Sequence, residues 1–128
     1  MTIRGITLDT GALVAIERRK QRGTQLLELA KQRQAVLTVP VPVVTEWWRG
    51  RTDVRERILD AVNVEPLSIA VAKSAGEALA RVPAATAIDA IVMAFAAARG
   101  DVVFTGDLDD LQRLQAVFPT VRILGADA

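Results

Sequence analysis

The sequence predicts an α/β protein, a three-layer α/β/α sandwich with a mostly parallel central sheet. Short apolar stretches of strand length alternate with longer amphipathic stretches of helix length, as in folds that join parallel strands by crossover helices. The strand-length stretches are unbroken apolar runs, as expected of parallel strands covered on both faces. The chain of 128 residues is 51% hydrophobic and 24% charged. These values are typical of a globular protein, and we expect one domain, residues 1–128.

The first elements follow from local composition. Residues 3–8 are apolar and β-branched, which predicts a buried strand that ends at Asp9. Residues 12–22 predict a helix with Leu13 and Ile16 on its apolar face. The second helix is expected to begin at an N-cap threonine and to bury an aliphatic stripe: Thr24, then Leu26, Leu27, Leu29 and Ala30.

Prolines mark the boundaries in the middle of the chain. Residues 35–39 predict a strand that Pro40 ends, and Pro42 suits the first turn of a helix over residues 43–50. A charged helix is expected next, over residues 52–61, with Ile58 and Leu59 turned inward. Residues 62–67 predict a short strand or a connector, and Pro66 favours the edge of the sheet.

Caps and turns define the last elements. Ser68 caps a predicted helix that extends to residue 81, and Thr86 caps the most apolar helix, residues 87–99, which Gly100 ends. Residues 101–105 predict a strand and residues 106–110 a turn. A short helix over residues 111–117, capped by Asp110, and a closing strand over residues 121–124 complete the prediction.

Cysteine and histidine are both absent. Their absence excludes a disulfide scaffold, a thiolate nucleophile, His-bound zinc and a Ser-His-Asp triad. The start of the chain has neither the apolar run nor the cleavage site of a signal peptide. The most apolar stretch, residues 84–98, contains Asp89 and is too short for a transmembrane span. We therefore expect a soluble, cytoplasmic protein without a membrane partner.

Four acidic side chains stand where the predicted fold brings them toward one edge of the sheet. Asp9 follows the first strand and Asp107 follows the strand over residues 101–105, while Glu46 and Asp89 lie near the starts of helices. In parallel sheets, ligands bind beyond the carboxyl ends of the strands. Converging carboxylates repel one another, and a divalent cation relieves that repulsion. With only oxygen ligands at hand, Mg²⁺ or Mn²⁺ is the expected metal.

Each acid also has a purely structural interpretation. Asp9 would cap the following helix, and Asp89 would interact with a helix N-terminus. Glu46 would pair with Arg49 or Arg51 on its own surface. Asp107 would be an ordinary turn residue. Taken singly, none of these positions is specific, and the information lies in the ordered set.

Three of the acids stand in distinctive contexts. Glu46 ends Val-Val-Thr-Glu, Asp89 lies in Ala-Ile-Asp-Ala-Ile-Val-Met-Ala, and Asp107 lies in Thr-Gly-Asp-Leu-Asp-Asp-Leu. With Asp9 after the first strand, this order resembles the PIN domain. More narrowly, it resembles VapC, the ribonuclease toxin of VapBC toxin–antitoxin modules. The resemblance extends from residue 3 to about residue 124, and the contexts of Asp89 and Asp107 are its most specific parts.

The resemblance implies a PIN-like fold and a metal-dependent endoribonuclease that cleaves structured RNA such as tRNA or rRNA, leaving 3′-hydroxyl and 5′-phosphate ends. Carried over by position, the acidic quartet is matched by Asp9, Glu46, Asp89 and Asp107, and the bracing hydroxyl by Thr105. Gly11 stands where the family often has Ser or Ala, which is a mild departure. For an auxiliary acid in the last motif, Asp109 and Asp110 are both candidates.

We expect Asp9, Asp89 and Asp107 to hold Mg²⁺, for which Mn²⁺ can substitute, directly or through water. Glu46 would complete the shell or orient the attacking water, and Thr105 would fix the geometry. Residues 1–60 carry an excess of four positive charges, and residues 61–128 an excess of three negative charges. Basic side chains are expected to hold RNA phosphates at the rim, unless they only solvate helix surfaces: Arg18, Arg19, Lys20, Arg22, Arg49 and Arg51.

Partners are suggested by the adjacent tryptophans and by the resemblance. We expect one of Trp47 and Trp48 in the core and the other in an apolar groove for a partner. The resemblance implies a cognate VapB-like antitoxin, which would lay an amphipathic segment along such a groove, and a homodimer.

Two further classes of protein compete with a ribonuclease. One is a catalytically silent PIN-like module that binds RNA or protein; a DNA nuclease of related fold would differ only in substrate. The other is a receiver-type phosphoacceptor domain. That fold requires an acidic pair after its first strand, where this chain has Asp9 and Thr10, and a lysine after its last strand, where it has Gly125 and Ala126.

Overall fold

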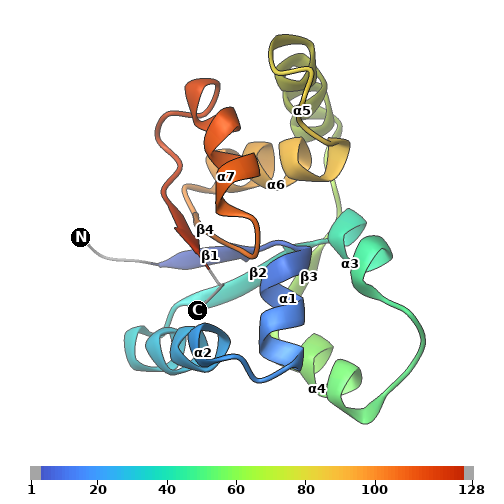
Figure 1. The fold of residues 1–128 in the computed structure, drawn as a ribbon, viewed down its shortest axis with the longest axis vertical. Helices are drawn as coiled ribbons and strands as arrows, with labels where there is room; N and C mark the ends of the chain where they lie inside the picture. Colours follow the sequence, from blue (N-terminus) through green and yellow to red (C-terminus); the bar gives the residue numbers. More distant parts are fainter. Residues whose placement is uncertain (1–3, 126–128) are drawn as a thin grey trace.

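Five parallel strands form the centre of the computed structural model, which describes residues 4–125 (Figure 1). In chain order they are β1 (Gly5–Leu8), β2 (Val36–Pro40), β3 (Asn63–Glu65), β4 (Val102–Thr105) and β5 (Ile123–Gly125). Their order across the sheet is β3-β2-β1-β4-β5, and each neighbouring pair is parallel. The predicted fold class is therefore confirmed, and β3 is the edge strand that Pro66 suggested.

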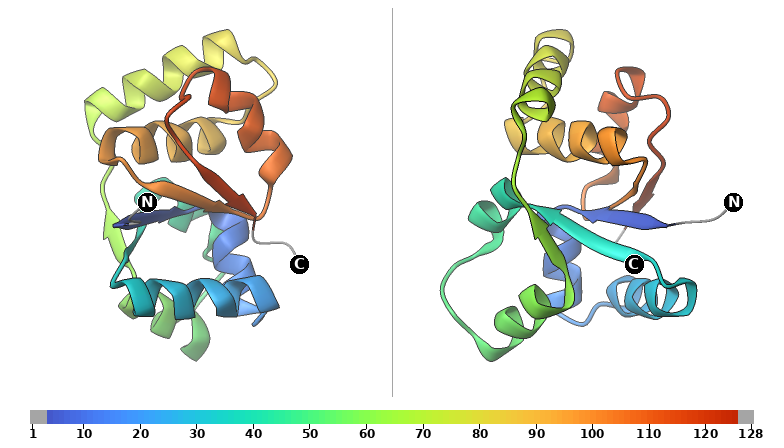
Figure 2. Two further views of the ribbon diagram at one scale, coloured as in Figure 1. Left: turned by 90° about the vertical axis from the view of Figure 1, so that its left-hand side faces the viewer. Right: turned by 180° about the vertical axis from the view of Figure 1, so that it is seen from behind.

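Helices cover both faces of this sheet, which gives the three predicted layers (Figures 1 and 2). On one face lie α1 (Thr10–Glu17), α2 (Gln21–Arg33) and α4 (Asp53–Ala61). On the other lie α5 (Ile69–Arg81), α6 (Ala87–Arg99) and α7 (Leu108–Gln112). The short helix α3 (Val41–Trp47) directly follows β2, and a 3-10 turn, Arg113–Ala116, extends α7. Within residues 4–125, every helix is too short or too polar to cross a lipid bilayer.

The core lies between the sheet and the helices. Ile6, Leu8, Val39 and Val103 are fully buried in the three central strands. Removing each such side chain from water stabilises the fold by about 1.5–3 kcal/mol. On α6, the apolar run that is too short for a membrane span is instead buried between the sheet and α5. Parallel strands that are covered on both faces require this composition.

The strand order creates a switch point between β1 and β4. From β1 the chain proceeds outward to β2 and β3, and then returns to the other side of β1 to form β4 and β5. The loops after β1 and β4 therefore leave the sheet in different directions and open a crevice at its carboxyl edge. Asp9 directly follows β1 and Thr105 ends β4, so both residues stand at this crevice.

Several predicted boundaries are confirmed by hydrogen bonds. The Ser68 hydroxyl accepts from the Val71 N–H at 3.1 Å, and the Thr86 hydroxyl accepts from the Asp89 N–H at 3.2 Å. Gly100 ends α6 with φ of +73°, a conformation that favours glycine.

The boundary between the first two helices was predicted incorrectly. Helix α1 ends at Glu17 because the chain turns through Arg19, whose φ is +54°. Helix α2 begins at Gln21, so Thr24 lies inside it and does not cap it. Leu27 is 39% exposed instead of belonging to the buried stripe. The buried face runs through Gly23, which carries no hydrophobic signal, and a Cβ there would lie 2.8 Å from the Ala15 carbonyl oxygen.

Other boundaries differ by a few residues. Helix α3 ends at Trp47 instead of residue 50. Helix α7 begins at Leu108, so Asp107 occupies its N-cap position and Asp110 lies in its first turn. The prediction that Asp110 caps this helix was therefore wrong, because three closely spaced aspartates each suit a helix start. The predicted strand over residues 3–8 begins outside the described residues.

Candidate active site

Asp9 is the most buried acid at the carboxyl edge of the sheet, with 5% of its surface exposed. Its Oδ1 accepts from the Ala12 N–H at 2.8 Å, which caps α1, and from the Gly106 N–H at 3.2 Å. Its Oδ2 accepts a short hydrogen bond from the Thr105 hydroxyl. The predicted capping interpretation is thus correct, and in addition the carboxylate is held from across the sheet.

Burial raises the pKa of Asp9 above its ordinary value and is the largest influence on it. The hydrogen bonds from Thr105, Ala12 and Gly106 act in the opposite direction, and the charge of Glu46 raises the pKa further. The three hydrogen bonds therefore do not offset the cost of burying the charged carboxylate of Asp9.

Thr105 connects Asp9 with the turn that follows β4. It is fully buried. Its hydroxyl donates to Asp9 and accepts from the Asp107 N–H at 2.8 Å. One side chain thus fixes both the Asp9 carboxylate and the backbone of the turn that carries Asp107.

Two glycines let the turns after β1 and β4 meet. A Cβ on Gly11 would lie 2.5 Å from the Gly106 Cα, and a Cβ on Gly106 would lie 2.5 Å from the Gly11 Cα. Backbone packs on backbone here, so no larger residue fits without displacement. The sequence marked Gly11 only as a mild departure from the family pattern, and the structure supplies the physical reason for it.

Glu46 lies in the last turn of α3 and its side chain reaches α1. Its Oε1 accepts a short hydrogen bond from the Thr10 hydroxyl, next to Asp9 in the chain. The structural interpretation of Glu46 was wrong: Arg49 donates to the carbonyls of Thr45 and Trp48, and Arg51 pairs with Asp53 at 3.2 Å.

Asp89 lies in the first turn of α6 and is partly buried. Its pKa is raised to about 6, mainly by burial, against a lowering hydrogen bond from Thr86. The charges of Asp9, Asp110 and Asp107 raise it further. Three other carboxylates therefore lie within electrostatic reach of Asp89.

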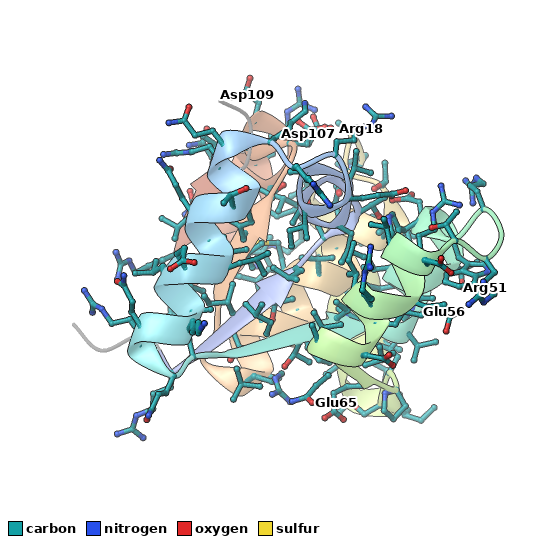
Figure 3. All side chains as sticks on the ribbon, turned by 90° about the horizontal axis from the view of Figure 1, so that it is seen from below. Arg18, Arg51, Glu56, Glu65, Asp107 and Asp109 are labelled. Atoms are coloured by element: carbon teal, nitrogen blue, oxygen red, sulfur yellow. The ribbon has the colours of Figure 1, made fainter. Side chains whose placement is uncertain are left out.

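Asp107 is exposed, and its carboxyl group faces that of Asp110. A hydrogen bond between the two side chains is the largest cause of the raised pKa of Asp107, followed by burial. Asp110 also pairs with Arg113 at 3.5 Å. Of the two candidates for an auxiliary acid, Asp110 raises the pKa values of both Asp89 and Asp107. Asp109, in the first turn of α7, is exposed and points outward (Figure 3).

The four predicted acids thus come from four parts of the fold, and each lies close enough to another to shift a pKa or have its own pKa shifted. Among residues 4–125, no ion pair joins any of them to an arginine or lysine. Within the same part of the chain, no three acidic side chains meet closely enough to hold one ion. The donor set suits a divalent cation in its oxygen chemistry and uncompensated charge.

The predicted basic rim makes no ion pair with these acids among residues 4–125. Arg18, Arg19 and Lys20 follow the end of α1, about 12 Å along the helix from Asp9. Arg22 donates to the carbonyl of Gly125, the register partner of Thr105, at 3.1 Å and so lies at the carboxyl edge of the sheet. Arg51 lies well away from Asp107 in Figure 3. Of the predicted cations, Arg49 stands nearest in the chain to an acid of the site, three residues after Glu46.

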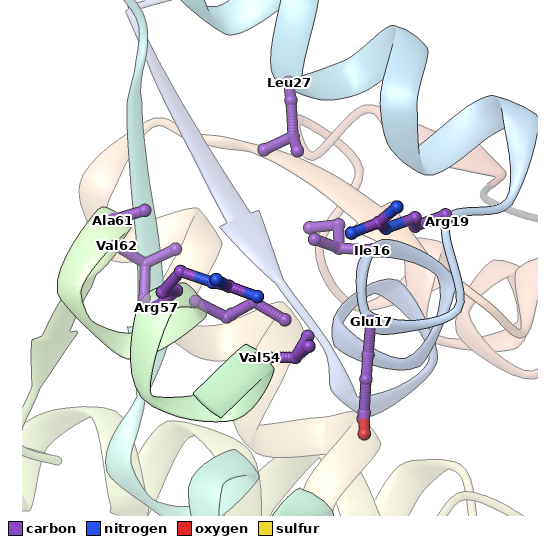
Figure 4. Close-up of a pocket in the computed structure, with 9 residues that line it drawn as sticks. Ile16, Glu17, Arg19, Leu27, Val54, Arg57, Ala61 and Val62 are labelled. Carbon is purple, nitrogen blue, oxygen red and sulfur yellow. The ribbon is translucent and has the colours of Figure 1, made fainter. Parts of the chain in front are cut away.

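The two tryptophans divide as expected between core and groove. Trp47 is 4% exposed. Trp48 is partly exposed and lines a groove between α3 and α4 with Val41, Val44 and Leu59. A second groove, of about 300 Å³, lies between α1, α2 and α4 (Figure 4). Its wall includes Ile16, Val54 and Ile58, with Arg19 and Arg57 beside them.

The sequence did not indicate one polar residue of this region. The indole N–H of Trp47 donates to Glu17 Oε1 at 2.9 Å. Glu17 follows Leu13 by four residues, on the same helix face. The four-residue spacing from the buried Leu13 could therefore have predicted that Glu17 is partly buried.

Both a family model and solved structures match most of this chain. Residues 6–117 match the family model of the PIN domain. No curated protein matches the sequence. VapBC2 from Rickettsia felis, solved bound to a DNA fragment from their promoter, aligns with a TM-score of 0.74 at 16% identity, over 94% of this chain and 98% of the other.

Two further crystal structures are similar. DNA-bound VapBC from Salmonella typhimurium aligns with a TM-score of 0.72 at 20% identity, over 97% of this chain and 99% of the other. VapC20 from Mycobacterium tuberculosis, described as a toxin that cleaves the sarcin-ricin loop, aligns with a TM-score of 0.65 at 22% identity, over 91% and 98%. At these identities the structural likeness concerns the fold.

Proposed function

The chain belongs to the PIN-domain family, and from this membership and its acidic site we propose that it is a Mg²⁺-dependent endoribonuclease. It hydrolyses phosphodiester bonds in structured RNA, tRNA or rRNA, and it is the toxin of a type II toxin–antitoxin module.

One observation carries the proposal. Asp9, Glu46, Asp89 and Asp107 come from four separate parts of the fold and have no cationic partner among residues 4–125. The charge of Glu46 raises the pKa of Asp9, and the charge of Asp9 raises the pKa values of Asp89 and Asp107. Such an arrangement opposes folding unless the charges serve another purpose. A divalent cation is the ligand that compensates several carboxylates at once.

The chain's own residues have distinct roles in this proposal. Asp9, Asp89 and Asp107 would hold Mg²⁺, or Mn²⁺ in its place. When bound, the ion lowers the pKa of water and neutralises phosphoryl oxygens. Glu46 completes the site or orients the attacking water. Thr105 keeps the Asp9 carboxylate in place, and Asp110 orients the Asp107 side chain by a hydrogen bond.

The toxin role is supported by the complexes in which similar structures were solved. The similar structures from Rickettsia felis and Salmonella typhimurium are VapBC complexes, and VapC20 is described as a toxin that cleaves the sarcin-ricin loop. The partner is a VapB-like antitoxin with an amphipathic segment, for which the two apolar grooves of this chain offer room. As in the family, the toxin acts as a homodimer.

A catalytically silent module that binds RNA or protein is the second candidate. The observation in its favour is that no three acidic side chains of the described residues meet at one point. The two candidates differ in whether phosphodiester bonds are broken.

RNA cleavage decides between them. Purified protein is incubated with total tRNA and rRNA in Mg²⁺, and RNA ends are mapped by sequencing. We expect discrete cuts with the wild-type protein and none in EDTA. In Asp9→Asn and Asp89→Asn the rate falls by at least about 100-fold, because each substitution removes a metal-binding carboxylate.

Asp60→Asn is the matched control, because Asp60 is an exposed aspartate near the end of α4 and is not among the groups that shift the pKa values of Asp9, Asp89 and Asp107. Its cleavage rate should equal that of the wild type. Full activity in both Asp9→Asn and Asp89→Asn, or cuts that persist in EDTA, would refute the proposed function.

A further inference from the structure

Glu17 is the one acid of α1, and it joins three helices. It is the last residue of α1, and each of its carboxylate oxygens has its own donor. Oε1 accepts from the Trp47 indole N–H at 2.9 Å, and Oε2 accepts from Arg55 Nε at 3.1 Å. Both charged side chains are about one-fifth exposed. The carboxylate thus connects α1 to α3 and α4 in a partly buried place, where such contacts are stronger than at an open surface.

Trp47 stands next to Glu46 in the last turn of α3, and the two side chains contact opposite ends of α1. Glu46 accepts from the hydroxyl of Thr10, the first residue of α1, and Trp47 donates to Glu17, the last. An eight-residue helix is about 12 Å long. Consecutive helical residues point about 100° apart. Two neighbouring side chains of α3, Glu46 and Trp47, therefore bond to the two ends of α1.

Packing orders α3 through the buried Val43 and Trp47, and the Trp47–Glu17 hydrogen bond adds a directional contact that fixes its rotation about its own axis. The helix has seven residues, and its N-cap, Pro40, makes no side-chain capping bond. Helices this short depend on tertiary contacts for their order. Arg55 extends the attachment, because its guanidinium also donates to the Gly50 carbonyl at 2.9 Å, in the loop that follows α3.

We propose that Glu17 is a positioning residue: by holding the Trp47 indole, it fixes the rotation of α3 and keeps Glu46 turned toward Thr10 and Asp9. This inference rests on the proposed function, in which Glu46 acts beside the metal-binding acids. A rotation of α3 that moves the indole N–H away from Glu17 also moves the Glu46 carboxylate away from Thr10.

The first test needs neither metal nor RNA. Backbone amide signals of Thr10 and Gly11 are recorded by NMR for the wild type, Glu17→Ala, Glu17→Gln and Trp47→Phe, with Glu28→Ala as an exposed-glutamate control on α2. Glu17→Gln keeps the Oε1 acceptor for Trp47 while it weakens the contact with Arg55. Trp47→Phe removes the N–H but keeps most of the ring.

We expect the Thr10 and Gly11 signals to shift in Glu17→Ala and Trp47→Phe, and to stay at their wild-type positions in Glu17→Gln and Glu28→Ala. Should Glu17→Ala fail to fold, Trp47→Phe carries the comparison. Unchanged Thr10 and Gly11 signals in a folded Glu17→Ala or Trp47→Phe would overturn the proposal.

The second test uses RNA cleavage per folded molecule, with the folded fraction taken from urea unfolding. Displacing a group at the reacting centre costs about 10- to 100-fold in rate. We expect kcat to fall by about 10-fold or more in Glu17→Ala and Trp47→Phe, with KM within about twofold, and to return in Glu17→Gln. A merely structural role would lower stability and leave kcat per folded molecule unchanged, which refutes the proposal. A wild-type protein that cleaves no RNA refutes the proposed function, and the NMR test then decides alone.

Discussion

Two buried aspartates of this protein have opposite surroundings, and the contrast shows what is unusual about Asp9. Asp101 is 8% exposed and pairs with Arg99 Nε at 3.1 Å, while the Thr7 hydroxyl donates to it at 2.8 Å. Asp9 is equally buried but has only neutral donors. Because neutral hydrogen bonds compensate a buried charge less than a cation does, Asp101 suits a structural role and Asp9 suits a ligand-binding one.

At the residue scale, the raised pKa of Asp89 predicts how stability depends on pH. With a pKa of about 6 in the folded state against 3.8 as a reference, the native protein binds more protons than the unfolded chain between these values. The free energy of unfolding therefore contains a favourable contribution that is present below the reference pKa and is lost as pH rises through about 6.

Asp89→Asn removes this dependence. Urea unfolding in EDTA should show equal stability of variant and wild type near about pH 4, and a variant that is more stable by about 1–2 kcal/mol above about pH 6.5, after allowance for partial exposure. Asp60→Asn is the control and should match the wild type at every pH. A stability difference for Asp89→Asn that does not change with pH would contradict the raised pKa.

At the scale of elements, the site depends on how closely the turns after β1 and β4 approach. The N-terminal turn of α1 and the turn that begins at Gly106 touch through backbone atoms. This contact brings the Gly106 N–H to Asp9 and places the Thr105 hydroxyl between Asp9 and Asp107. The positions of Asp9, Thr105 and Asp107 therefore depend on this one contact between the two turns.

Gly11→Ala tests this crossing. The added methyl group would overlap the backbone of Gly106, and overpacking of this kind costs about 1–3 kcal/mol. We expect that loss in urea unfolding, together with reduced RNA cleavage per folded molecule. Gly76→Ala is the matched control, because a Cβ at Gly76 in α5 meets no atom within 4 Å. It should stabilise the protein by about 0.5–1 kcal/mol. Equal stability of Gly11→Ala and the wild type would contradict the close approach.

Sequence patterns predicted these elements well where the local signal and the fold agree. Ser68, Thr86 and Gly100 act as predicted because capping depends on neighbouring backbone groups alone. Predictions failed where a distant contact decides. Leu27 is exposed because the α1–α2 contact is made through Gly23, and the end of α1 depends on a left-handed residue, Arg19, that no pattern marks.

At the scale of the whole molecule, the strand order explains why acids distant in sequence come together. The switch between β1 and β4 puts Asp9 and Asp107 at one crevice, and the helices after β2 and before β4 bring Glu46 and Asp89 toward it. That acids so distant in sequence approach one edge of the sheet was predictable, because topology is implied by alternating elements. The Thr10–Glu46 and Glu17–Trp47 contacts were not, because they depend on side-chain directions across packed helices.

The central claim is that these carboxylates form one site for a divalent cation, and calorimetric titration with Mn²⁺ tests it most directly. The wild-type protein and Asp60→Asn should bind Mn²⁺ saturably with equal affinity, and Asp9→Asn should bind at least about 10-fold more weakly. Absence of saturable binding to the wild type, or equal binding by Asp9→Asn, would contradict the claim.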